Sequence, residues 1–362
     1  MAGFEGVKWA SHQMQYILGE KAFSLLAADA GVSAVTRTIH YGQFMAFEGI
    51  RFFCKRDESG KVIANFLNWD KNLKRFRRGI SFNLSRKQQG LVPDLDEMTH
   101  AFIQKYFKNP SMRPFFEEMA DLGAQGYLRP FTVDEEQSIG VTFPGRPSIR
   151  AVVCRYDRYL GEPFGGVVVP NMVRAVGANR TGCLKLGINY LMSVKALDAA
   201  REIDPDAASA LFLDDRPEAP LDDRLVTEWD SSCCLFALKD GSVIKIPESP
   251  LILPSVTIQG ITAILRRMGV SVHERDISYG ELISLVKNEE LVAVCSIGTA
   301  GILNRCHHLR LVDGDGETLA VHRPDESHDL FARLSDARAY YWDIYREKED
   351  LPDGMRLDTY SL

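Results

Sequence analysis

Lys185 is the residue of this sequence whose surroundings point most directly to chemistry. Its neighbours Cys183, Leu184, Leu186 and Ile188 form an apolar setting, and desolvation there should lower the pKa of a lysine and make its amine a nucleophile for a carbonyl carbon. A surface lysine at the end of a strand is the simpler interpretation of the same segment. The partners that follow along the chain decide between the two.

An acid and a helix start follow the lysine in order. Glu228, in Leu-Val-Thr-Glu, could hold a ring nitrogen or could be a solvated strand residue. Val256 and Thr257 begin a helical pattern, and the first N–H groups of a helix form an anion site. Thr257 is also a good capping residue, so capping and anion binding are compatible interpretations.

A second backbone cradle lies at Gly298-Thr299-Ala300, directly after a strand-like run over 291–295. The glycine permits close approach of the backbone, and the threonine adds a hydroxyl to the amides that would hold a phosphate. An amine for an aldehyde, an acid for a ring nitrogen and two phosphate cradles are together what a protein needs to hold pyridoxal phosphate (PLP).

The residue types and the order of these segments resemble those of the branched-chain aminotransferase family, the fold-type IV PLP enzymes. The resemblance runs from about His40 to the C-terminal helix. Each segment alone is a weak match, whereas the whole set in the family's order is a strong one. The segments are His40-Tyr41-Gly42, Phe47-Glu48-Gly49-Ile50-Arg51, Tyr127-Leu128-Arg129-Pro130, Lys185 with Asn189-Tyr190, Leu253-Pro254 with Val256-Thr257, Glu274-Arg275, and Gly298-Thr299-Ala300.

This resemblance implies a role for each matched residue. Lys185 would form a Schiff base with PLP and then move the proton of the substrate Cα. Glu228 would keep the ring nitrogen protonated, so that the ring works as an electron sink. The expected cofactor-binding residues are Arg86, Tyr190, Glu228, Val256, Thr257, Gly298 and Thr299, and the expected substrate-binding residues are Tyr41, Phe47, Tyr127, Arg129 and Ala300.

Several of these residues have structural alternatives. Tyr190 could pack against a helix instead of facing the cofactor, and an arginine such as Arg86 beside a lysine is often simply exposed. Phe164, which could contribute to the substrate wall, has core packing as its alternative, as do the other aromatic residues of the substrate group. For Arg129 the alternative is a structural salt bridge, because a buried arginine needs a partner.

The resemblance implies an aminotransferase that moves the amino group of an L-amino acid to a 2-oxo acid such as 2-oxoglutarate, with ping-pong kinetics. The amino donor would be branched-chain, otherwise hydrophobic, or a specialised biosynthetic substrate. Similar enzymes are homodimers, so we expect a homodimer. Two alternatives stay open. One is a lyase resembling aminodeoxychorismate lyase, which the retained Tyr127-x-Arg129 disfavours, and the other is a non-catalytic paralogue that binds PLP or has lost it.

Four departures from the family's pattern fall mostly around the substrate pocket. None removes a group needed to hold PLP, so we expect intact cofactor chemistry and a changed side-chain preference. The departures are one extra residue between Tyr41 and Phe47, two extra residues and a lost proline before Asn83 and Arg86, a longer turn after Glu228 without the usual asparagine, and Leu253-Pro-Ser-Val-Thr-Ile258 where the family has Leu-Pro-Gly-x-Thr-Arg.

Composition excludes several classes of protein. The net charge is −6, so nucleic acid is a poor partner, and the basic run 71–78 is expected to be a solvated face or a hairpin edge. The seven cysteines are an odd number and include no Cys-x-x-Cys, which argues against disulfides and a zinc site and favours a reducing cytoplasm. With no signal peptide and no apolar run near ~20 residues, we expect a soluble, cytoplasmic protein without membrane contact.

The pattern of elements predicts a mixed α/β (α+β) fold with two domains. We expect a small N-terminal domain over 1–158, an interdomain loop over the Gly- and Pro-rich 159–168, and a large C-terminal PLP-binding domain over 169–362. Apolar spacing predicts helices over 94–107, 114–122, 189–203, 256–268 and 329–347. The Asp-Gly-Asp-Gly at 313–316 predicts a hairpin turn. No Gly-x-Gly-x-x-Gly follows a strand, so a dinucleotide site is not expected.

Overall fold

The computed structural model describes residues 3–160, 164–174, 181–216 and 218–362. The chain divides into two compact units. The smaller unit contains Phe4–Arg158, Leu184–Ile188 and Arg356–Leu362, and the larger unit contains Met1–Gly3, Tyr159–Cys183 and Asn189–Met355. The segment that carries Lys185 therefore belongs to the smaller unit, although residues of the larger unit flank it in sequence.

The smaller unit is built on an eight-stranded sheet with the order β19-β6-β5-β7-β8-β3-β4, and β2 pairs with β8. Every pair in it is antiparallel. The strands of this half of the chain are β1 (Gly3–Glu5), β2 (Lys8–Trp9), β3 (His12–Ile17), β4 (Ala22–Ala27), β5 (Ile50–Arg56), β6 (Val62–Leu67), β7 (Gln125–Asp134), β8 (Pro147–Tyr156) and β9 (Arg158–Leu160), with β19 (Leu357–Ser361) from the end of the chain.

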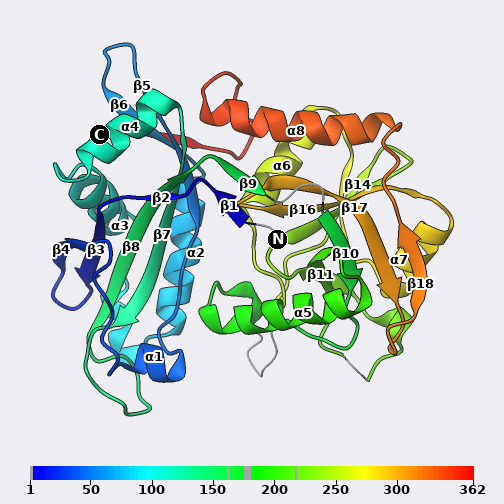
Figure 1. Cartoon of the computed structure of the whole chain (residues 1–362), viewed down its shortest axis with the longest axis horizontal. Helices are drawn as coiled ribbons and strands as arrows, with labels where there is room; N and C mark the ends of the chain where they lie inside the picture. The colour runs from blue at the N-terminus through cyan, green and yellow to red at the C-terminus, as the bar shows by residue number, and fades with distance from the viewer. Residues whose placement is uncertain (1–2, 161–163, 175–180, 217) are drawn as a thin grey trace. The chain divides into compact units, whose positions relative to one another are not determined.

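Helices and a cluster of aromatic rings cover this sheet (Figure 1). Phe52 of β5 packs against the rings of Phe66, Phe107 and Phe116, and the last two stack with centroids 4.6 Å apart. Aromatic residues bury large apolar areas, so this cluster dominates the core of the unit. The helices are α1 (Arg37–Tyr41), α2 (Trp69–Phe82), the 3₁₀ turn η1 (Arg86–Leu91), α3 (Leu95–Thr99), the π-helical η2 (His100–Phe107) and α4 (Arg113–Leu122).

Two predicted helices of this unit are confirmed and one interpretation is wrong. Helical structure covers the predicted 94–107 as α3 and η2, and α4 ends at Gly123, whose φ of 58° needs a glycine. The basic run 71–78, however, is neither a hairpin edge nor wholly solvated. It lies in α2, and Arg75 shares the buried face of that helix with Asn72 and Phe76 because positions three and four apart lie together.

The larger unit contains a nine-stranded mixed sheet with the order β12-β11-β10-β17-β16-β13-β14-β15, and β18 pairs with β17. β10 is parallel to both β11 and β17, whereas β16 is antiparallel to its neighbours. The strands are β10 (Phe164–Val168), β11 (Ala207–Leu213), β12 (Val226–Trp229), β13 (Cys233–Leu238), β14 (Val243–Lys245), β15 (Val272–Glu274), β16 (Leu291–Gly298), β17 (Ile302–Val312) and β18 (Thr318–His322).

Helices pack on both sides of this sheet. α5 packs against β10 and β11, whereas α6 and α8 pack against each other and against β16, as Figure 1 shows. The hairpin turn predicted at 313–316 is confirmed, because the Asp313 side chain accepts the amides of Asp315 and Glu317. The helical elements are η3 (Thr181–Cys183), η4 (Gly187–Asn189), α5 (Tyr190–Ile203), η5 (Leu221–Asp223), α6 (Val256–Arg267), α7 (Tyr279–Lys287) and α8 (Asp329–Tyr345).

The predicted loop over 159–168 is wrong for its last five residues, which form strand β10 within the sheet. Phe164 is 5% exposed and stands edge-on to Trp229 with ring centroids 5.3 Å apart, so it packs in the core of the larger unit. A Cβ at Gly166 would lie 2.6 Å from the Trp229 ring. The glycine serves close packing here, which composition alone did not distinguish from a loop. Residues 161–163 lie outside the described residues.

Candidate active site

The segment of Lys185 lies against the 45–47 segment of the smaller unit. Ala46 and Leu186 form an antiparallel bridge, and the amide of Phe47 donates to the Lys185 carbonyl at 3.1 Å. α2 passes close by, because a Cβ on Gly79 would approach Ala46 Cβ to 2.9 Å. Backbone bonds and close packing therefore fix where the Lys185 side chain starts.

The Lys185 amine lies in a setting that is apolar on one side and charged on the other. Its Nζ is 4.9 Å from the centroid of the Phe47 ring, and its charge also acts on the Glu48 carboxylate. Leu184 and Leu186 on either side are buried, as the sequence predicted, whereas Ile188 is 65% exposed. The amine therefore lies near both an aromatic ring and a carboxylate.

Glu48 and Arg75 form a buried bidentate pair beside this lysine. Arg75 Nε and Nη2 donate to the two oxygens of Glu48 at 2.7 and 2.5 Å, and both side chains are at most 8% exposed. Burial raises the pKa of Glu48, but the charge and hydrogen bonds of Arg75, then the charge of Lys185, outweigh it and hold the pKa below its usual value. The carboxylate is therefore an anion that balances two cations.

Three of the predicted substrate residues come together around Arg129. Its Nη2 donates to the Tyr127 hydroxyl at 2.8 Å, and its guanidinium lies 5.0 Å from the ring centroids of both Phe47 and Tyr127. Gly49 admits this arrangement, because a Cβ there would overlap the Tyr127 hydroxyl at 2.0 Å. Stacking on aromatic faces thus replaces the salt bridge that was the alternative for Arg129.

Two predicted residues of the smaller unit lie elsewhere. Tyr41 is the last residue of α1, is 45% exposed, and donates its hydroxyl to the Ile139 carbonyl at 2.6 Å. Arg86 is exposed at the start of η1. Arg75 was missed, although Asn72-x-x-Arg75 has the same spacing as the Asn83-x-x-Arg86 that was chosen. The signal that separates them is burial on the inner face of a helix.

A second group of residues, in the larger unit, centres on Glu228. This carboxylate lies in β12, all four residues of which are buried, and is 2% exposed. Its Oε1 accepts from Arg174 Nη1 at 2.7 Å and from the Leu253 amide at 3.2 Å. The contact with Leu253 links the acid to the segment that leads into α6.

Arg174 is a second functional candidate that the sequence interpretation missed. It is 4% exposed, donates to the Gly182 carbonyl, and its guanidinium lies 5.6 Å from the centroid of the Tyr190 ring. Burial lowers its pKa, but the charges of Glu228, Tyr190 and Cys233 outweigh burial and raise it. The rule that a buried acid needs a cation could have prompted the search, but nothing local indicates which arginine supplies it.

The start of α6 has the geometry of an anion site. Ser255 is the N-cap, and its Oγ accepts the amide of Ile258 at 3.2 Å, so the capping role predicted for Thr257 is wrong. Val256 and Thr257 are the first two helical residues, and among the described residues nothing accepts from their amides, which precede the first intrahelical bond. Both residues are buried. Their amides and the positive helix end therefore remain for an anion.

The second cradle lies at the turn between β16 and β17. Gly298 pairs with Ile302, which places Thr299 and Ala300 in the connecting turn. A Cβ on Gly298 would come within 3.3 Å of Ser232 Cβ, so the glycine lets this turn pack on the loop after β12. Ser232 and Ser296 also share a hydrogen bond of 2.6 Å.

Asp230 holds the loop after Glu228 in place. Its carboxylate accepts from Ser209 Oγ at 2.6 Å, and its carbonyl accepts from Ser193 Oγ. Burial raises the pKa of Asp230 to about 6, although the hydrogen bonds from Ser209 and Ser231 lower it. A buried carboxyl group therefore anchors this loop.

Other classes of site leave no trace in the part of the chain that the structure describes. No group of three His, Cys, Asp or Glu side chains there could hold a metal ion, and no helix there is long and apolar enough to cross a membrane. None of the seven cysteines, all of which the structure describes, forms a disulfide.

No protein-family model matches the chain, but individual proteins do. The chain is 27% identical over 308 residues to branched-chain-amino-acid transaminase 1 of Bacillus subtilis (strain 168), an alignment that covers 82% of this chain and 78% of that protein. It is 26% identical over 290 residues to transaminase htyB of Aspergillus rugulosus, covering 75% and 68% of the two chains.

Solved structures share its fold. The branched-chain amino acid aminotransferase of Escherichia coli superposes with a TM-score of 0.67 at 19% identity and covers 97% of this chain and 99% of that one. The branched-chain amino acid aminotransferase of Thermobaculum terrenum, in its PLP form, superposes with a TM-score of 0.65 at 16% identity, covering 94% and 95%. The mixed α/β fold predicted from the sequence is confirmed.

Proposed function

Because this chain is a transaminase of the branched-chain aminotransferase family, with the fold-type IV architecture, we propose that it transfers an amino group from an L-amino acid to a 2-oxo acid. The acceptor is 2-oxoglutarate or a related acid, and the donor has a hydrophobic side chain. PLP is the proposed cofactor. The observation that carries the proposal is the buried Glu228 carboxylate, held by Arg174 and linked to the start of α6.

The residues of the larger unit fit the needs of PLP. A buried anion suits a protonated ring nitrogen, and the start of α6 and the turn after Gly298 offer backbone donors for a phosphate. When bound, PLP supplies an electron sink that stabilises negative charge at the substrate Cα. Glu228 would hold the ring nitrogen, and Val256, Thr257, Gly298 and Thr299 would hold the phosphate.

Arg174 supports Glu228 in this proposal. An arginine stays charged in proteins, so it keeps the paired carboxylate anionic even though both are buried. The same guanidinium lies over Tyr190, whose hydroxyl is proposed to face the phenolic oxygen of the cofactor. One arginine thereby orients two of the proposed cofactor contacts.

Lys185 is the proposed covalent and acid–base residue. Its amine would hold PLP through the aldehyde group of the cofactor, and the same amine would serve as the base and acid that move the proton of the substrate Cα. Glu48 and Arg75 position the amine, because the Glu48 anion supports a positive charge at Nζ. We also propose Arg75, rather than the exposed Arg86, as the arginine with a function here.

The substrate side of the proposal rests on the Arg129 group. Arg129 and the Tyr127 hydroxyl are donors for a carboxylate, and Phe47 gives an apolar wall next to them. Ala300, in the turn after Gly298, is proposed to line the same substrate. Tyr41, whose hydroxyl is bonded to Ile139, would act only after a rearrangement of its loop.

Two measurements on the full chain loaded with PLP test the proposal. A panel of L- and D-amino acids with 2-oxoglutarate should yield glutamate, with parallel double-reciprocal lines. Borohydride reduction and peptide mass mapping should place the pyridoxyl group on Lys185. A label on another lysine would contradict the assignment. Release of pyruvate without glutamate would instead support an elimination enzyme, and a protein that binds no PLP would support a non-catalytic paralogue.

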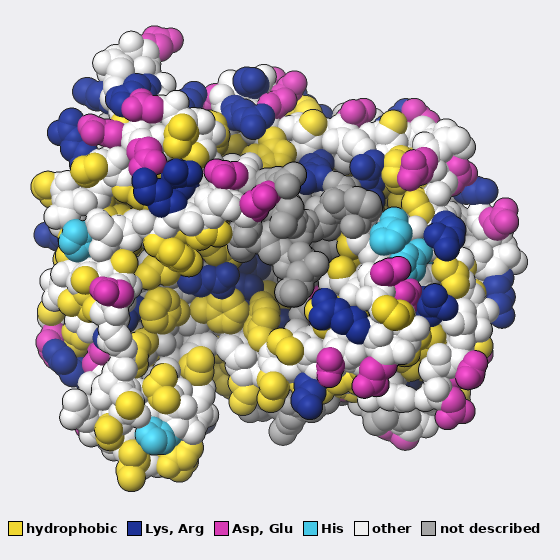
Figure 2. Space-filling view, in the orientation of Figure 1, with side chains coloured by type: hydrophobic (Ala, Val, Ile, Leu, Met, Phe, Trp, Pro, Cys, Tyr) yellow, Lys and Arg dark blue, Asp and Glu magenta, His cyan; other side chains and the backbone are white. Residues whose placement is uncertain are grey.

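We further propose that the chain forms a homodimer. Hydrophobic side chains gather over α1 and the nearby loop of the smaller unit (Figure 2). Ile139, Val141 and Phe143 of that loop are 61%, 76% and 54% exposed, and clustered exposure of this kind marks interaction surfaces. Val141→Asp should convert a dimer to a monomer in light scattering, whereas a monomeric wild-type protein would contradict the proposal.

A further inference from the structure

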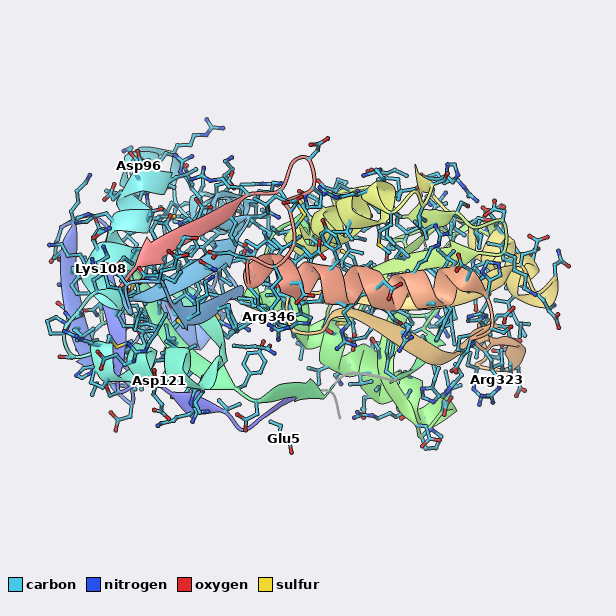
Figure 3. The ribbon with its side chains drawn as sticks, turned by 90° about the horizontal axis from the view of Figure 1, so that it is seen from above. Glu5, Asp96, Lys108, Asp121, Arg323 and Arg346 are labelled. Atoms are coloured by element: carbon cyan, nitrogen blue, oxygen red, sulfur yellow. The ribbon has the colours of Figure 1, made fainter. Side chains whose placement is uncertain are left out.

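Strand β4 (Ala22–Ala27) is the outermost strand at one edge of the smaller unit's sheet, as Figure 1 shows. Figure 3 shows the same end of the unit from above, with the helical segment between Asp96 and Lys108 beside it. None of the six residues of β4 is buried, whereas four of the six residues of its neighbour β3 are. Among the described residues, no further strand pairs with the outer side of β4.

The hydrogen bonds to β3 show which backbone groups of β4 point outward. The Ala28 amide donates to the Ser11 carbonyl at 3.0 Å. Bonds to one neighbour fall on alternate residues of an antiparallel strand, so the even-numbered residues of β4 bond to β3. The odd-numbered residues Phe23, Leu25 and Ala27 therefore direct their N–H and C=O groups away from the sheet. Among the described residues, nothing bonds to these groups of Phe23 and Leu25.

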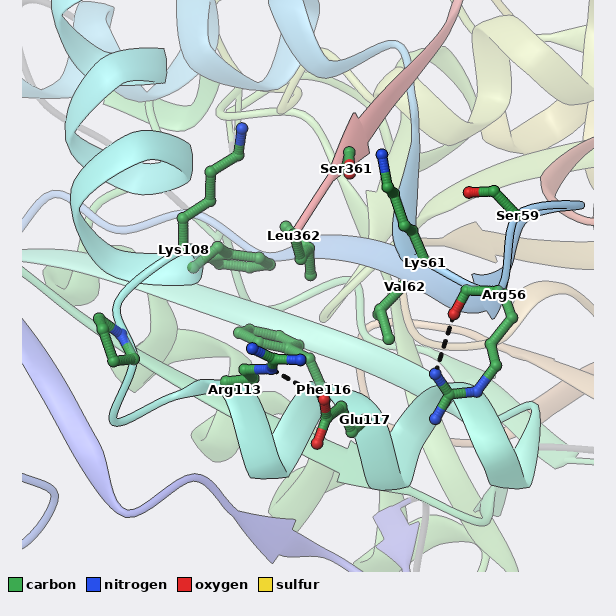
Figure 4. Close-up of a pocket in the computed structure, with 13 residues that line it drawn as sticks. Arg56, Ser59, Lys61, Val62, Lys108, Arg113, Phe116, Glu117, Ser361 and Leu362 are labelled. Atoms are coloured by element: carbon green, nitrogen blue, oxygen red, sulfur yellow. Dashed lines mark hydrogen bonds and ion pairs between the residues drawn. The ribbon is translucent and has the colours of Figure 1, made fainter.

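β4 has none of the features by which proteins protect an exposed strand edge. Its sequence Ala-Phe-Ser-Leu-Leu-Ala contains no charge and no proline, and its pairing with β3 contains no bulge. By contrast, the other strands that end the two large sheets, β12, β15 and β19, each contain an acidic residue. Figure 4 also shows the side chains of Lys61 and Lys108 on either side of the end of β19. The exception at β4 indicates an edge that pairs with another strand.

A second copy of β4 is the strand that fits this edge. A two-fold axis perpendicular to the sheet would place the two strands antiparallel and keep both faces of the sheet continuous. With the axis at Leu25, that residue faces Leu25 of the partner subunit, and Phe23 faces Ala27 of the partner subunit. Every outward-pointing residue then meets another. With the axis at Ser24, Ala27 would instead face Lys21 of the partner subunit, whose φ of 50° is not that of a strand.

Side chains and charges agree with the axis at Leu25. The Leu25 side chain shares a face with Met14 of β3, which is buried, so the pairing would extend this apolar row across the axis. The same register brings Lys21 opposite Asp29 of the partner subunit, and both residues are exposed. Lys21 also contacts Glu97 at 3.4 Å, so its charge supports the register without deciding it.

We propose that β4 is a docking edge for a second copy of this chain, so that two smaller units join their sheets through an antiparallel β4–β4 pair. Main-chain hydrogen bonds would supply the affinity, as in other cases of strand addition. A pair of six-residue strands buries less than the roughly 800 Å² per partner of a standard interface, so the contact should be weak and concentration-dependent. The inference does not depend on the proposed function or on the homodimer proposed through the loop 139–143, because β4 shares no residue with either.

Cysteine cross-linking of the PLP-loaded full chain tests the register. Leu25→Cys places two thiols directly opposite each other across the axis, at the Cα separation of about 5.5 Å of a hydrogen-bonded pair, which a disulfide can span. Ser24→Cys is the matched control, because Ser24 faces Leu26 of the partner subunit instead of itself. Mild oxidation should yield about tenfold more covalent pairs of chains for Leu25→Cys than for Ser24→Cys or the wild type.

Each outcome of the cross-linking decides the proposal. A covalent pair from Leu25→Cys alone supports both the edge and its register. Equal yields from the two variants, or no covalent pair from either, would overturn the proposal, and a covalent pair from Ser24→Cys alone would overturn the axis at Leu25. Leu25→Cys should cross-link equally well when combined with Val141→Asp, and a loss of cross-linking there would contradict the independence from the loop.

Sedimentation velocity on a proline variant gives an independent test. Leu25→Pro removes an outward N–H and no bond to β3, at a position where an edge strand tolerates proline. In the Val141→Asp chain, this change should weaken self-association about tenfold or more, because each copy loses one main-chain hydrogen bond. Turnover should stay at the value of the parent chain, since β4 contains no proposed site residue. Undiminished self-association of the Leu25→Pro chain would contradict the docking edge.

Discussion

The two groups of candidate residues use the same buried pair, a glutamate with an arginine, for different purposes. In the smaller unit, the Glu48 carboxylate accepts hydrogen bonds from Nε and Nη2 of Arg75, and its charge also balances that of Lys185. In the larger unit, Glu228 receives Arg174 and a backbone amide on one oxygen, Oε1. The first pair is closed on itself and supports a neighbouring amine. In the proposed function the second pair has another purpose, because the arginine orients the acid and the acid contacts the cofactor.

The comparison teaches that burial of a charge pair does not by itself identify function. A closed bidentate pair satisfies its own charges, so its loss should mainly lower the free energy of unfolding. Loss of a pair that presents its acid to a ligand should mainly lower the turnover rate. The variants below separate these two effects, beginning with the largest.

Lys185→Ala removes the one group that no other residue can replace. We expect turnover to fall by about four orders of magnitude or more, because both the covalent link and the proton transfer at Cα are lost. The thermal midpoint should change little, since the side chain is only partly buried. Single-turnover kinetics with the best amino donor measure the effect, and turnover near the wild-type rate would refute the role of Lys185.

The two glutamates give the sharpest contrast when each is changed to glutamine. Glu228→Gln should lower kcat by about two to three orders of magnitude, as loss of a stabilising charge commonly does, while PLP is still bound. Glu48→Gln leaves Arg75 buried without its anion and should reduce the free energy of unfolding by about 3–5 kcal/mol.

Urea unfolding and steady-state kinetics on both variants decide the matter. Glu48→Gln combined with Arg75→Met is the control, because removal of both partners should recover much of the lost stability. A larger fall in kcat for Glu48→Gln, together with a larger loss of unfolding free energy for Glu228→Gln, would reverse the distinction between the two pairs.

Arg174 should act by positioning. Arg174→Met is expected to lower kcat about tenfold and to shift the acidic limb of the kcat profile, because Glu228 loses the cation that keeps it anionic. Arg174→Lys keeps a charge and should restore part of kcat. A purely structural arginine would change the thermal midpoint without moving the pH profile, so an unmoved profile would argue against positioning.

Asp230 and Glu48 should produce opposite pH dependences of stability. Burial raises the pKa of Asp230 to about 6, so between about pH 4 and pH 6 the folded chain binds more protons than the unfolded chain, and the free energy of unfolding falls as pH rises. Glu48 has a lowered pKa, despite its burial, through Arg75 and Lys185. Its contribution is complete above the ordinary glutamate pKa and is lost as pH falls below it.

Asp230→Asn isolates the first of these effects. The variant should be more stable than the wild type above pH 6, by at most about 3 kcal/mol, and the two should converge near pH 4. Urea titrations from about pH 4 to pH 8 measure the difference. A difference that does not vary with pH would show that Asp230 does not titrate in this range.

Order along the chain carried most of what could be predicted. The lysine, the acid and the two cradles were chosen because their order along the chain resembles that of the branched-chain aminotransferases, and their roles stay predictions. The helices at 189–203 and 256–268 were predictable from apolar spacing. These signals are local, so they remain visible in a single sequence.

What sequence did not reveal depends on partners distant in the chain. Arg174 and Arg75 are identified only by the glutamates they meet, 54 and 27 positions away. Ser255 caps α6 although Thr257 is an equally good capping type, because the choice depends on where the helix begins. Gly166 was taken as a loop glycine, yet it makes room for Trp229 inside a sheet.

Strand β19 has a consequence for the order in which the molecule can be made. It pairs along the whole of β6, and the hydrogen bond between Thr359 and Asn65 joins positions 294 apart. On the ribosome, β6 therefore emerges long before its outer neighbour, and one edge of the smaller unit's sheet stays open while the larger unit is synthesised. An open edge is a template for wrong pairing. Nascent chains halted before Leu357 should therefore depend on chaperones, and release of the last strand should end that dependence.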